Sequence, residues 1–409
     1  MIQKKRWLFL IVCLASAFPM HAQKWVDLGA STRISSVVPA DGFGGSTWQG
    51  TGIAAPYTSN TARVVDAWSG GVGRTKSGSE MMCVFGGGHN DDPDDSLYCI
   101  DLRTNTIARV FGPAGYDVGG GSADWGGCPV GLPDSGVVAP NAVHSTAGLV
   151  YISATDQIHK FNGALACGNG FHTNDTWLFS FSPGSWARQD PTNGTPLPCS
   201  TLIAVDGTCA GGDDFWTSDV YDPNSGLVFE ALPVSGTIYV YSYNPSTNTE
   251  SALLASAPGP DQATGDVDAS RKLIVMFGED LSGNPHLIHI DISTPSRPVI
   301  SDVYGSSSGC AAPAGAVWPG VSYYSVDRLT YIWPKNSGGT YYTYNPDTKT
   351  CVTHALSGGP PNNASYPADA GVYGRFRCFA SLKKCVVVND ATADAWALDL
   401  TAPSYCCKR

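Results

Sequence analysis

The chain has 409 residues and a formal net charge of -11, and charged residues make up only 14% of it. This acidic balance argues against a nucleic-acid partner, because phosphate contacts require a basic face. With 47 glycines, 28 prolines and 11% aromatic residues, the composition favours many short strands joined by tight turns over long amphipathic helices.

The first residues have the pattern of a secretory signal peptide. Lys4, Lys5 and Arg6 precede an apolar run over residues 7–17, and small residues suited to cleavage follow. We therefore expect a signal peptide over residues 1–23 and a single domain over residues 24–409, in an exported protein that is extracellular or periplasmic. No later stretch approaches the roughly eighteen apolar residues of a membrane helix, so we expect no membrane insertion.

One pattern recurs along the rest of the chain: an apolar strand, a Gly- or Asp-rich loop, a strand containing tyrosine, a polar turn and a further strand. The clearest copy is "MMCVFGGGHNDDPDDSLYCIDLRTNTIARVF" at residues 81–111, and the others lie at 148–189, 225–254, 271–300, 327–356 and 382–400. A first strand is expected upstream of these elements, at residues 63–68 for the first copy. Such repeated four-stranded antiparallel units are typical of β-propeller blades.

The last copy supplies only three strands, ending at Leu400. The segment "KWVDLG" at residues 24–29 can add the missing outer strand, close the ring and cover its edges. The predicted fold class is therefore all-β: a single β-propeller of four-stranded antiparallel blades, closed by the N-terminal strand. Six blades are expected, with seven as the alternative if residues 24–75 hold another copy.

The stretches "FGGGHND" and "LYCIDLRTNTIARV" of the first copy resemble the kelch repeat, and "YGRFRCFASLKKCVVVND" resembles the final blade of secreted kelch-type or galactose-oxidase-like propellers. The resemblance covers nearly all of the chain after the signal peptide and implies the propeller fold. It leaves the chemistry open, because such propellers include oxidases, lyases, sialidase-like hydrolases and binding modules. Copper-radical oxidase chemistry is disfavoured, since the chain lacks the length for the extra domains of those enzymes.

Twelve of the 13 cysteines lie after the apolar N-terminal run. An even number in an exported chain favours disulfides. Cys83 and Cys99 are placed to bridge neighbouring strands of the first blade, Cys378 and Cys385 to bridge strands of the last. Cys199 with Cys209 is the simplest local pair in the loops, and the partners of the remaining cysteines stay open: Cys128, Cys167, Cys310, Cys351, Cys406 and Cys407.

In a propeller blade the loop between the second and third strands emerges on the same face as the connection to the next blade. The longest expected connections, at residues 112–144, 190–214 and 304–320, all belong to this face. Long loops on a rigid scaffold commonly carry binding and catalysis. We therefore expect the functional site on this loop face.

Four residues are the candidates for catalysis: His89, His144, Tyr373 and Arg377. Histidine titrates near neutral pH and can act as acid or base. His89 follows the glycine turn of the first blade, and His144 ends a long connection. The alternative for either histidine is a structural hydrogen bond to a neighbouring blade.

Five further residues are candidates for substrate binding: Trp125, His172, Trp216, Trp318 and Arg375. Arg375 and Arg377 alternate along one expected strand, so both are expected on one side of it, where guanidinium groups could bind a uronate carboxylate. Ion pairs with Asp219, Asp266 or Asp268 are the alternative. Exposed aromatic rings could stack on sugars, with buried packing between blades as the alternative.

No residue is assigned to a metal, and no cofactor is required by the sequence. The histidines at 89, 144 and 172 could converge to bind a metal ion, although they do not have the spacing of a metal signature. The aspartates at 91, 92, 94 and 95 could bind calcium, but they lack the ligand spacing of an EF-hand loop and also fit a solvated turn.

These observations predict a secreted, glycan-active propeller. The enzymatic form of this hypothesis is a polysaccharide lyase, in which an arginine neutralises a uronate and a histidine or tyrosine moves the proton. A lectin-like binding or adhesion module without chemistry is the alternative, and a self-assembling surface protein is a third. The expected partner is an extracellular polysaccharide or other glycan.

Overall fold

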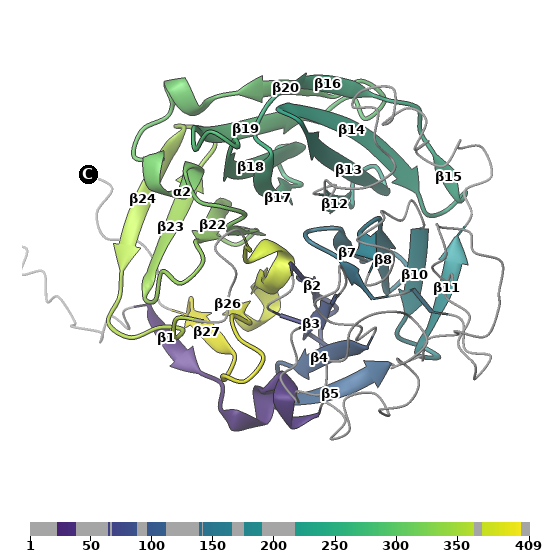
Figure 1. Cartoon of the computed structure of the whole chain (residues 1–409), viewed down its shortest axis with the longest axis vertical. Helices are drawn as coiled ribbons and strands as arrows, with labels where there is room; N and C mark the ends of the chain where they lie inside the picture. Colours follow the sequence, from purple (N-terminus) through teal and green to yellow (C-terminus); the bar gives the residue numbers. More distant parts are fainter. Residues whose placement is uncertain are drawn as a thin grey trace, which may run out of the picture.

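The computed structural model describes residues 23–37, 64–65, 68–87, 96–111, 139–140, 142–165, 176–189, 217–363 and 370–401. These residues form six antiparallel sheets arranged as a ring around a central axis (Figure 1). Five of the sheets have four strands and one has five. The predicted six-bladed β-propeller is confirmed. No helix within the described ranges is long and apolar enough to span a membrane.

The first three blades follow one another along the chain. Blade 1 contains β2 (Gly70–Arg74), β3 (Met81–Phe85), β4 (Leu97–Asp101) and β5 (Thr106–Phe111). Blade 2 contains β7 (Leu149–Ile152), β8 (Gln157–Phe161), β10 (Thr176–Ser180) and β11 (Ser185–Gln189). Blade 3 contains β12 (Ser218–Asp222), β13 (Leu227–Val234), β14 (Thr237–Asn244), β15 (Thr249–Glu250) and β16 (Ala255–Pro258). A small separate pair joins β6 (Val143–His144) to β9 (Ala164–Leu165).

The other three blades complete the ring. Blade 4 contains β17 (Gln262–Asp268), β18 (Leu273–Glu279), β19 (Pro285–Asp291) and β20 (Val299–Asp302). Blade 5 contains β21 (Gly320–Tyr324), β22 (Leu329–Trp333), β23 (Thr340–Asn345) and β24 (Thr350–Ala355). Blade 6 contains β25 (Phe376–Phe379), β26 (Lys384–Val387), β27 (Trp396–Asp399) and β1 (Lys24–Asp27).

The N-terminal strand closes the ring, as the sequence predicted. β1 pairs antiparallel with β27, with Trp25 opposite Leu398. The short turns η1 (Ala30–Thr32) and η2 (Ile34–Ser36) follow it. The hydroxyl of Ser31 donates a hydrogen bond to the carbonyl of Asn105 in blade 1 over 2.7 Å. The first described strand therefore covers the edge of blade 6, and the segment that follows it contacts blade 1.

The innermost strand of blade 1 differs from the prediction, which placed it at residues 63–68. The strand is the glycine-rich β2, whereas Val64 and Val65 lie in a turn and are fully buried. Glycine is needed there because the inner strands converge on the axis: a Cβ on Gly70 would lie 1.7 Å from the carbonyl oxygen of Thr146. Apolar patterning cannot identify a strand selected for close backbone approach.

The core lies between the blades. Within the described residues, five of the six interfaces between blades each hold one continuous buried apolar cluster. The interface between blades 2 and 3 is different, since its buried apolar side chains form two separate clusters. One of these contains Phe161 and Leu232, and the other contains Leu178 and Val228.

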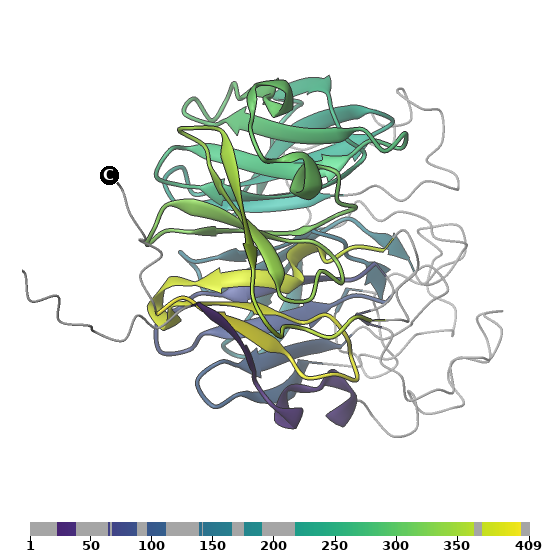
Figure 2. The ribbon, with the colours of Figure 1, turned by 90° about the vertical axis from the view of Figure 1, so that its left-hand side faces the viewer.

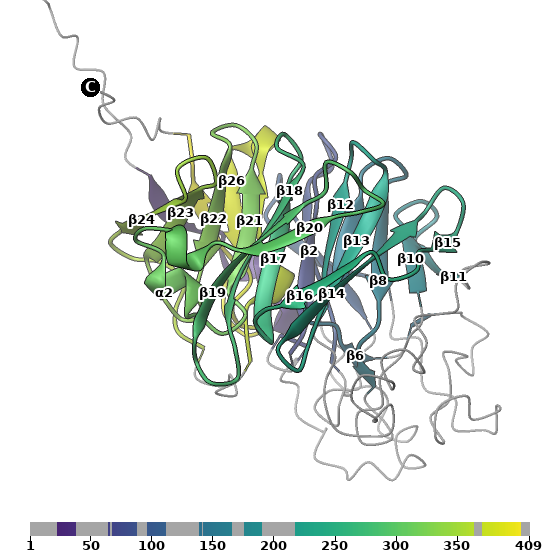
Figure 3. The ribbon, with the colours of Figure 1, turned by 90° about the horizontal axis from the view of Figure 1, so that it is seen from above.

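The strands run between two faces of the ring, as the side views show (Figures 2 and 3). One face carries the turns that join the first to the second strand of each blade. The other carries the connections between blades, including η4 (Tyr304–Ser306) and the short helix α2 (Ala311–Ala314) between blades 4 and 5. Two further turns, η5 (Tyr373–Arg375) and η6 (Ala380–Leu382), flank β25 in blade 6.

Candidate functional site

The innermost strands of all six blades enclose a cavity on the central axis. Its volume is about 480 Å³. Every blade contributes to its wall, with Val72, Tyr151, Tyr221, Asp266, Tyr323 and Arg377 as one lining residue from each. We call this space the axial cavity.

The axial cavity lies toward one end of the channel. Its wall also includes residues of the turns that join the first and second strands, among them Thr75, Ser153, Pro223, Ala269 and Ser325. It therefore lies on the side of the short turns, opposite the loop face that the sequence favoured for function.

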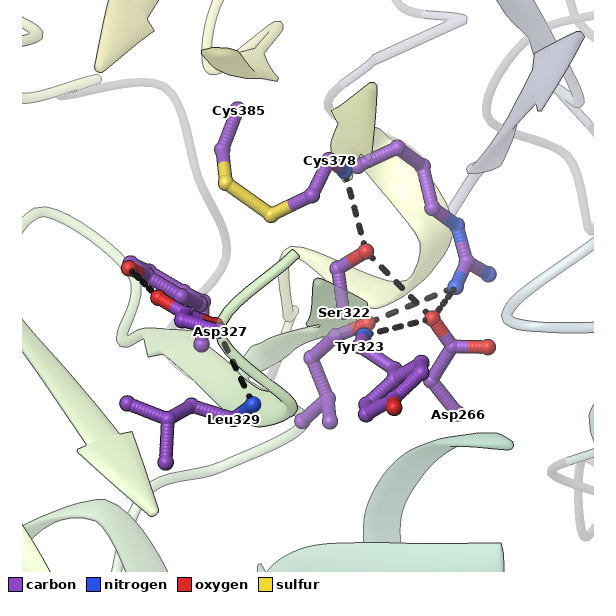
Figure 4. Close-up of a disulfide and its surroundings, with 10 residues drawn as sticks. Asp266, Ser322, Tyr323, Asp327, Leu329, Cys378 and Cys385 are labelled. Carbon is purple, nitrogen blue, oxygen red and sulfur yellow. Dashed lines mark hydrogen bonds and ion pairs between the residues drawn. A yellow bond between two sulfur atoms is a disulfide. The ribbon is translucent and has the colours of Figure 1, made fainter. Parts of the chain in front are cut away.

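An ion pair occupies the wall of the axial cavity. Arg377 Nη1 lies 3.4 Å from Asp266 Oδ2. The same carboxylate oxygen accepts hydrogen bonds from the backbone N–H of Tyr323 over 2.8 Å and from the hydroxyl of Ser322 over 3.3 Å. Its other oxygen accepts the N–H of Val267 over 2.8 Å. Figure 4 shows Asp266 facing Ser322 and Tyr323, near the disulfide of blade 6. The aspartate is thus held by the backbone as well as by the arginine.

Four tyrosines line the axial cavity: Tyr151, Tyr221, Tyr323 and Tyr324. Burial, with the nearby Asp156, raises the pKa of Tyr151 to about 12. Burial likewise raises the pKa of Tyr324 to about 12 and raises the pKa of Tyr221 and of Tyr323. The four hydroxyls therefore stay protonated at neutral pH. That of Tyr151 donates to Asp156 Oδ1 over 3.0 Å, and that of Tyr323 lies 3.1 Å from the hydroxyl of Ser270.

Arg375 has a different place from Arg377. It belongs to the turn η5 before the strand, so the two arginines do not alternate along one strand as the sequence suggested. Its side chain is fully buried. Its guanidinium donates hydrogen bonds to the carbonyls of Ser69 (2.8 Å), Val388 (2.8 Å) and Gly371 (2.6 Å). These bonds tie blade 6 to the start of blade 1.

Tyr373, Trp318 and His144 are also buried. The ring of Tyr373 lies 5.5 Å from that of Trp318, and the ring of His144 lies 4.9 Å from that of Trp68. None of the three lines the axial cavity. Of the predicted catalytic and substrate-binding residues that fall in the described ranges, Arg377 alone lines this cavity.

Several other predicted residues lie outside the described ranges. They are His89, Trp125, His172 and Trp216, together with the aspartates at 91, 92, 94 and 95, the pair Cys199 and Cys209, and residues 1–22 of the expected signal peptide. Their predictions stand as the sequence gives them.

Three disulfides are present in the described part of the chain. Cys83–Cys99 bridges β3 and β4, and Cys378–Cys385 bridges β25 and β26, at the positions that the sequence paired. The third, Cys310–Cys351, links the N-terminus of α2 to β24 across 41 residues. The sequence left the partners of these two cysteines open.

A second group of ionisable side chains lies between blades 2 and 3. His159, Asp219 and Glu230 are close enough to hold an ion together, and none of them lines the axial cavity. Burial lowers the pKa of His159 to about 3 and raises the pKa of Asp219 and of Glu230. Burial and the nearby Asp219 raise the pKa of Glu250 to about 8. Sequence reasoning named Asp219 only as a partner for arginine and did not find the group.

Sequence reasoning also missed Tyr151 and Tyr221 as cavity residues. Both lie near the end of an innermost strand, at the third position of β7 and the fourth of β12. Tyr323 has the equivalent fourth position in β21. A tyrosine recurring late in the first strand of a repeat was the signal that could have identified this wall.

No protein-family model matches the chain, and no curated protein sequence matches it. Among solved structures, TolB from Acinetobacter baumannii is 12% identical, with a TM-score of 0.41 over 71% of this chain and 54% of TolB. The chain thus spans about half of TolB. The Swd1 β-propeller domain of Myceliophteria thermophila is 9% identical, with a TM-score of 0.42 over 81% of this chain and 98% of that domain.

An auxiliary nutrient binding protein from Bacteroides thetaiotaomicron is 10% identical, with a TM-score of 0.43 over 78% of this chain and 65% of that one. Likeness at this level identifies no family and says nothing of activity. The assignment of the propeller rests on the strand pairing of the chain itself.

Proposed function

We propose that this chain is an exported binding propeller that takes a hydroxyl-rich ligand, the end of an extracellular glycan, in the axial cavity. The observation that carries the proposal is the cavity wall, to which four tyrosines and the Arg377–Asp266 ion pair all contribute. A volume of about 480 Å³ lies within the usual range of small-molecule sites.

The wall has the chemistry that sugars require. The half-buried ring of Tyr323 offers an apolar face for the C–H surface of a pyranose, and tyrosine hydroxyls can accept hydrogen bonds from its O–H groups. The carboxylate of Asp266 adds a strong acceptor, and the guanidinium of Arg377 adds donors. This mixture favours a polyhydroxylated ligand over a purely apolar one.

The charge of the wall favours a neutral glycan. Arg377 is already paired with Asp266, and that carboxylate is held by the backbone N–H groups of Val267 and Tyr323. A uronate entering the cavity would bring its negative charge beside Asp266, since the aspartate is fixed there. The axial cavity therefore supports a neutral sugar better than the acidic polysaccharide of the lyase hypothesis.

Binding without chemistry fits the described wall better than catalysis. A lyase needs a group that accepts a proton near neutral pH, whereas the pKa of Tyr151 and of Tyr324 is raised to about 12. The lyase hypothesis relied also on His89, which lies outside the described residues. Lyase activity and self-assembly at a surface therefore stay predictions.

Export and the kelch-type resemblance are part of the same proposal. Three disulfides suit an oxidising compartment, in agreement with the signal-like residues 1–23. The kelch-like stretch at residues 81–111 contains the second, third and fourth strands of blade 1, which supports a kelch-type repeat.

The test is a binding screen against neutral and acidic oligosaccharides, followed by titration calorimetry with the best ligand. Tyr323→Ala removes a half-exposed cavity ring and is expected to weaken binding roughly tenfold. Tyr342→Ala is the matched control, because Tyr342 is a half-buried tyrosine of the same blade that does not line the cavity. Asp266→Asn, which keeps the shape, is expected to weaken binding by a similar factor.

Ultraviolet absorbance of an unsaturated product is followed in the same screen. Its appearance with an acidic polysaccharide would support the lyase hypothesis and contradict binding without chemistry. Failure of every glycan to bind, or equal affinity of wild type and Tyr323→Ala, would contradict the axial site.

A further inference from the structure

His159 lies at the centre of the interface between blades 2 and 3. It belongs to β8, and it faces Asp219 of β12 and Glu230 of β13. His159 Nδ1 is 3.7 Å from Asp219 Oδ2, and His159 Nε2 is 3.7 Å from Glu230 Oε1. All three side chains are completely buried, with 0% of each exposed. An imidazole thus lies between two carboxyl groups, and none of the three side chains has exposed surface.

Strand register places the two carboxylates together. Asp219 and Glu230 are direct partners in the antiparallel pair β12–β13, so their side chains project from the same face of the blade and lie next to each other. Glu250 of β15 is buried nearby and raises the pKa of Glu230 through its charge. Three acidic groups and one histidine therefore converge from two blades.

Apolar packing encloses this group on both sides. The cluster that contains Leu178 and Val228 and the cluster that contains Phe161 and Leu232 are the two separate parts of this interface. The ring of Tyr243 stacks on His159 with centroids 5.1 Å apart. The other five interfaces have a continuous apolar core where this one is interrupted by four polar side chains, within the residues that the structure describes.

The polar atoms of His159 and Asp219 are not satisfied by hydrogen bonds from the described part of the protein. Both ring nitrogens of His159 and both carboxylate oxygens of Asp219 are buried without a hydrogen-bond partner there, whereas Glu230 and Glu250 are close enough to share a hydrogen bond when one of them is protonated. A buried carboxylate without a donor or counter-charge is strongly disfavoured. Lys160, the next residue of β8, is also buried and supplies one positive charge near Asp219. This single charge is fewer than the three acidic groups.

We propose that His159, Asp219 and Glu230 form a structural zinc site that joins blades 2 and 3. One donor atom from each of these residues lies within 4.8 Å of the other two. The edge of a tetrahedron with zinc bonds of about 2.1 Å is roughly 3.4 Å, so the 3.7 Å contacts of His159 need only small rotations to reach it. A contact of 3.7 Å is too long for a hydrogen bond.

The donor set selects the class of ion. Imidazole nitrogen is a good ligand for zinc and neighbouring transition metals, whereas calcium and magnesium take oxygen ligands almost exclusively. The three ligands are completely buried between two blades and away from the axial cavity, so the ion would hold the blades together rather than meet a substrate. The site is separate from the axial cavity, so it does not depend on the proposed glycan binding.

The test measures zinc in the full-length chain purified from zinc-supplemented medium, by plasma mass spectrometry. Wild type is expected to carry about one zinc ion per chain. Asp219→Asn and His159→Gln are expected to reduce this to below about a tenth. His289→Gln is the matched control, because His289 is a half-buried strand histidine that bonds to the Tyr344 hydroxyl, away from the group, and it is expected to keep the ion.

X-ray absorption at the zinc edge keeps the proposal testable if the variants fail to fold. Wild type is expected to show a shell of nitrogen and oxygen ligands, including imidazole and without sulfur. Wild-type protein without zinc, a sulfur-containing shell, or full zinc content in both Asp219→Asn and His159→Gln would overturn the proposal. Wild-type protein that binds a glycan but carries no zinc would contradict only the metal site. Wild-type protein that carries zinc but binds no glycan would contradict only the axial site.

Discussion

Replacing Arg375 by methionine tests whether this arginine holds the ring together or binds substrate. The guanidinium donates three hydrogen bonds of 2.6–2.8 Å to backbone carbonyls, and the side chain is fully buried. Methionine fills a similar volume but donates nothing, so the carbonyls of Ser69, Val388 and Gly371 lose this donor inside the protein.

The size of the effect follows from these contacts. A hydrogen bond to a charged group contributes about 1.5–3 kcal/mol, so three bonds at the lower limit give a loss of roughly 4–5 kcal/mol. The entropy of unfolding is about 2.1 cal/mol/K per residue. For a domain of roughly 380 residues, this loss corresponds to a fall in Tm of about 5–6 °C.

Differential scanning calorimetry measures the change, with Arg377→Met as the control. Arg377 loses only longer contacts, at 3.4 Å to Asp266 and 3.3 Å to the carbonyl of Val321. Asp266 keeps its backbone donors in that variant, so the expected fall in Tm is about 1–2 °C. An Arg375→Met variant that melts with wild type, or a larger loss in Arg377→Met than in Arg375→Met, would refute the reasoning.

Three more predictions concern stability. Hydrogen bonds from Arg103 and Ser381 outweigh the effect of burial and hold the pKa of Glu80 at about 2. This carboxylate therefore stabilises the fold above pH 4.5, and the contribution is lost as the pH falls toward 2. The urea midpoint of Glu80→Gln should change less than that of wild type between pH 5 and pH 2, and an equal change in both proteins would contradict this. Replacing Cys310 and Cys351 by serine opens a 41-residue loop and should lower the free energy of unfolding by about 4 kcal/mol. Removing the disulfide of blade 6, which closes a loop of 7 residues, should lower it by about 2 kcal/mol. Equal losses for the two disulfides in chemical denaturation would contradict this. Trp25→Ala removes the indole ring by which β1 packs on blade 5 and should lower the free energy of unfolding by about 3–4 kcal/mol. Limited proteolysis of this variant should then cut near β1. An unchanged cleavage pattern would argue against closure of the ring by this strand.

The sequence determined the architecture because contacts within a blade are local. Most neighbouring strands of a blade are joined by short turns, so alternation of apolar residues and turn residues indicates the hairpins directly. The pairing of Cys83 with Cys99 follows from the same locality, since both lie on adjacent strands of one repeat. Closure by residues 24–29 could be predicted because an incomplete last unit leaves an edge to be covered.

Only the tertiary structure decided what lies between blades and on the axis. His159 and Glu230 are 71 positions apart and meet because blade 2 packs on blade 3, which no periodicity encodes. Arg375 points to backbone carbonyls because the chain makes a turn before β25 rather than starting the strand early. The axial cavity exists because the innermost strands of six blades surround the central axis at a similar distance from it. The twist and spacing of whole sheets set that distance.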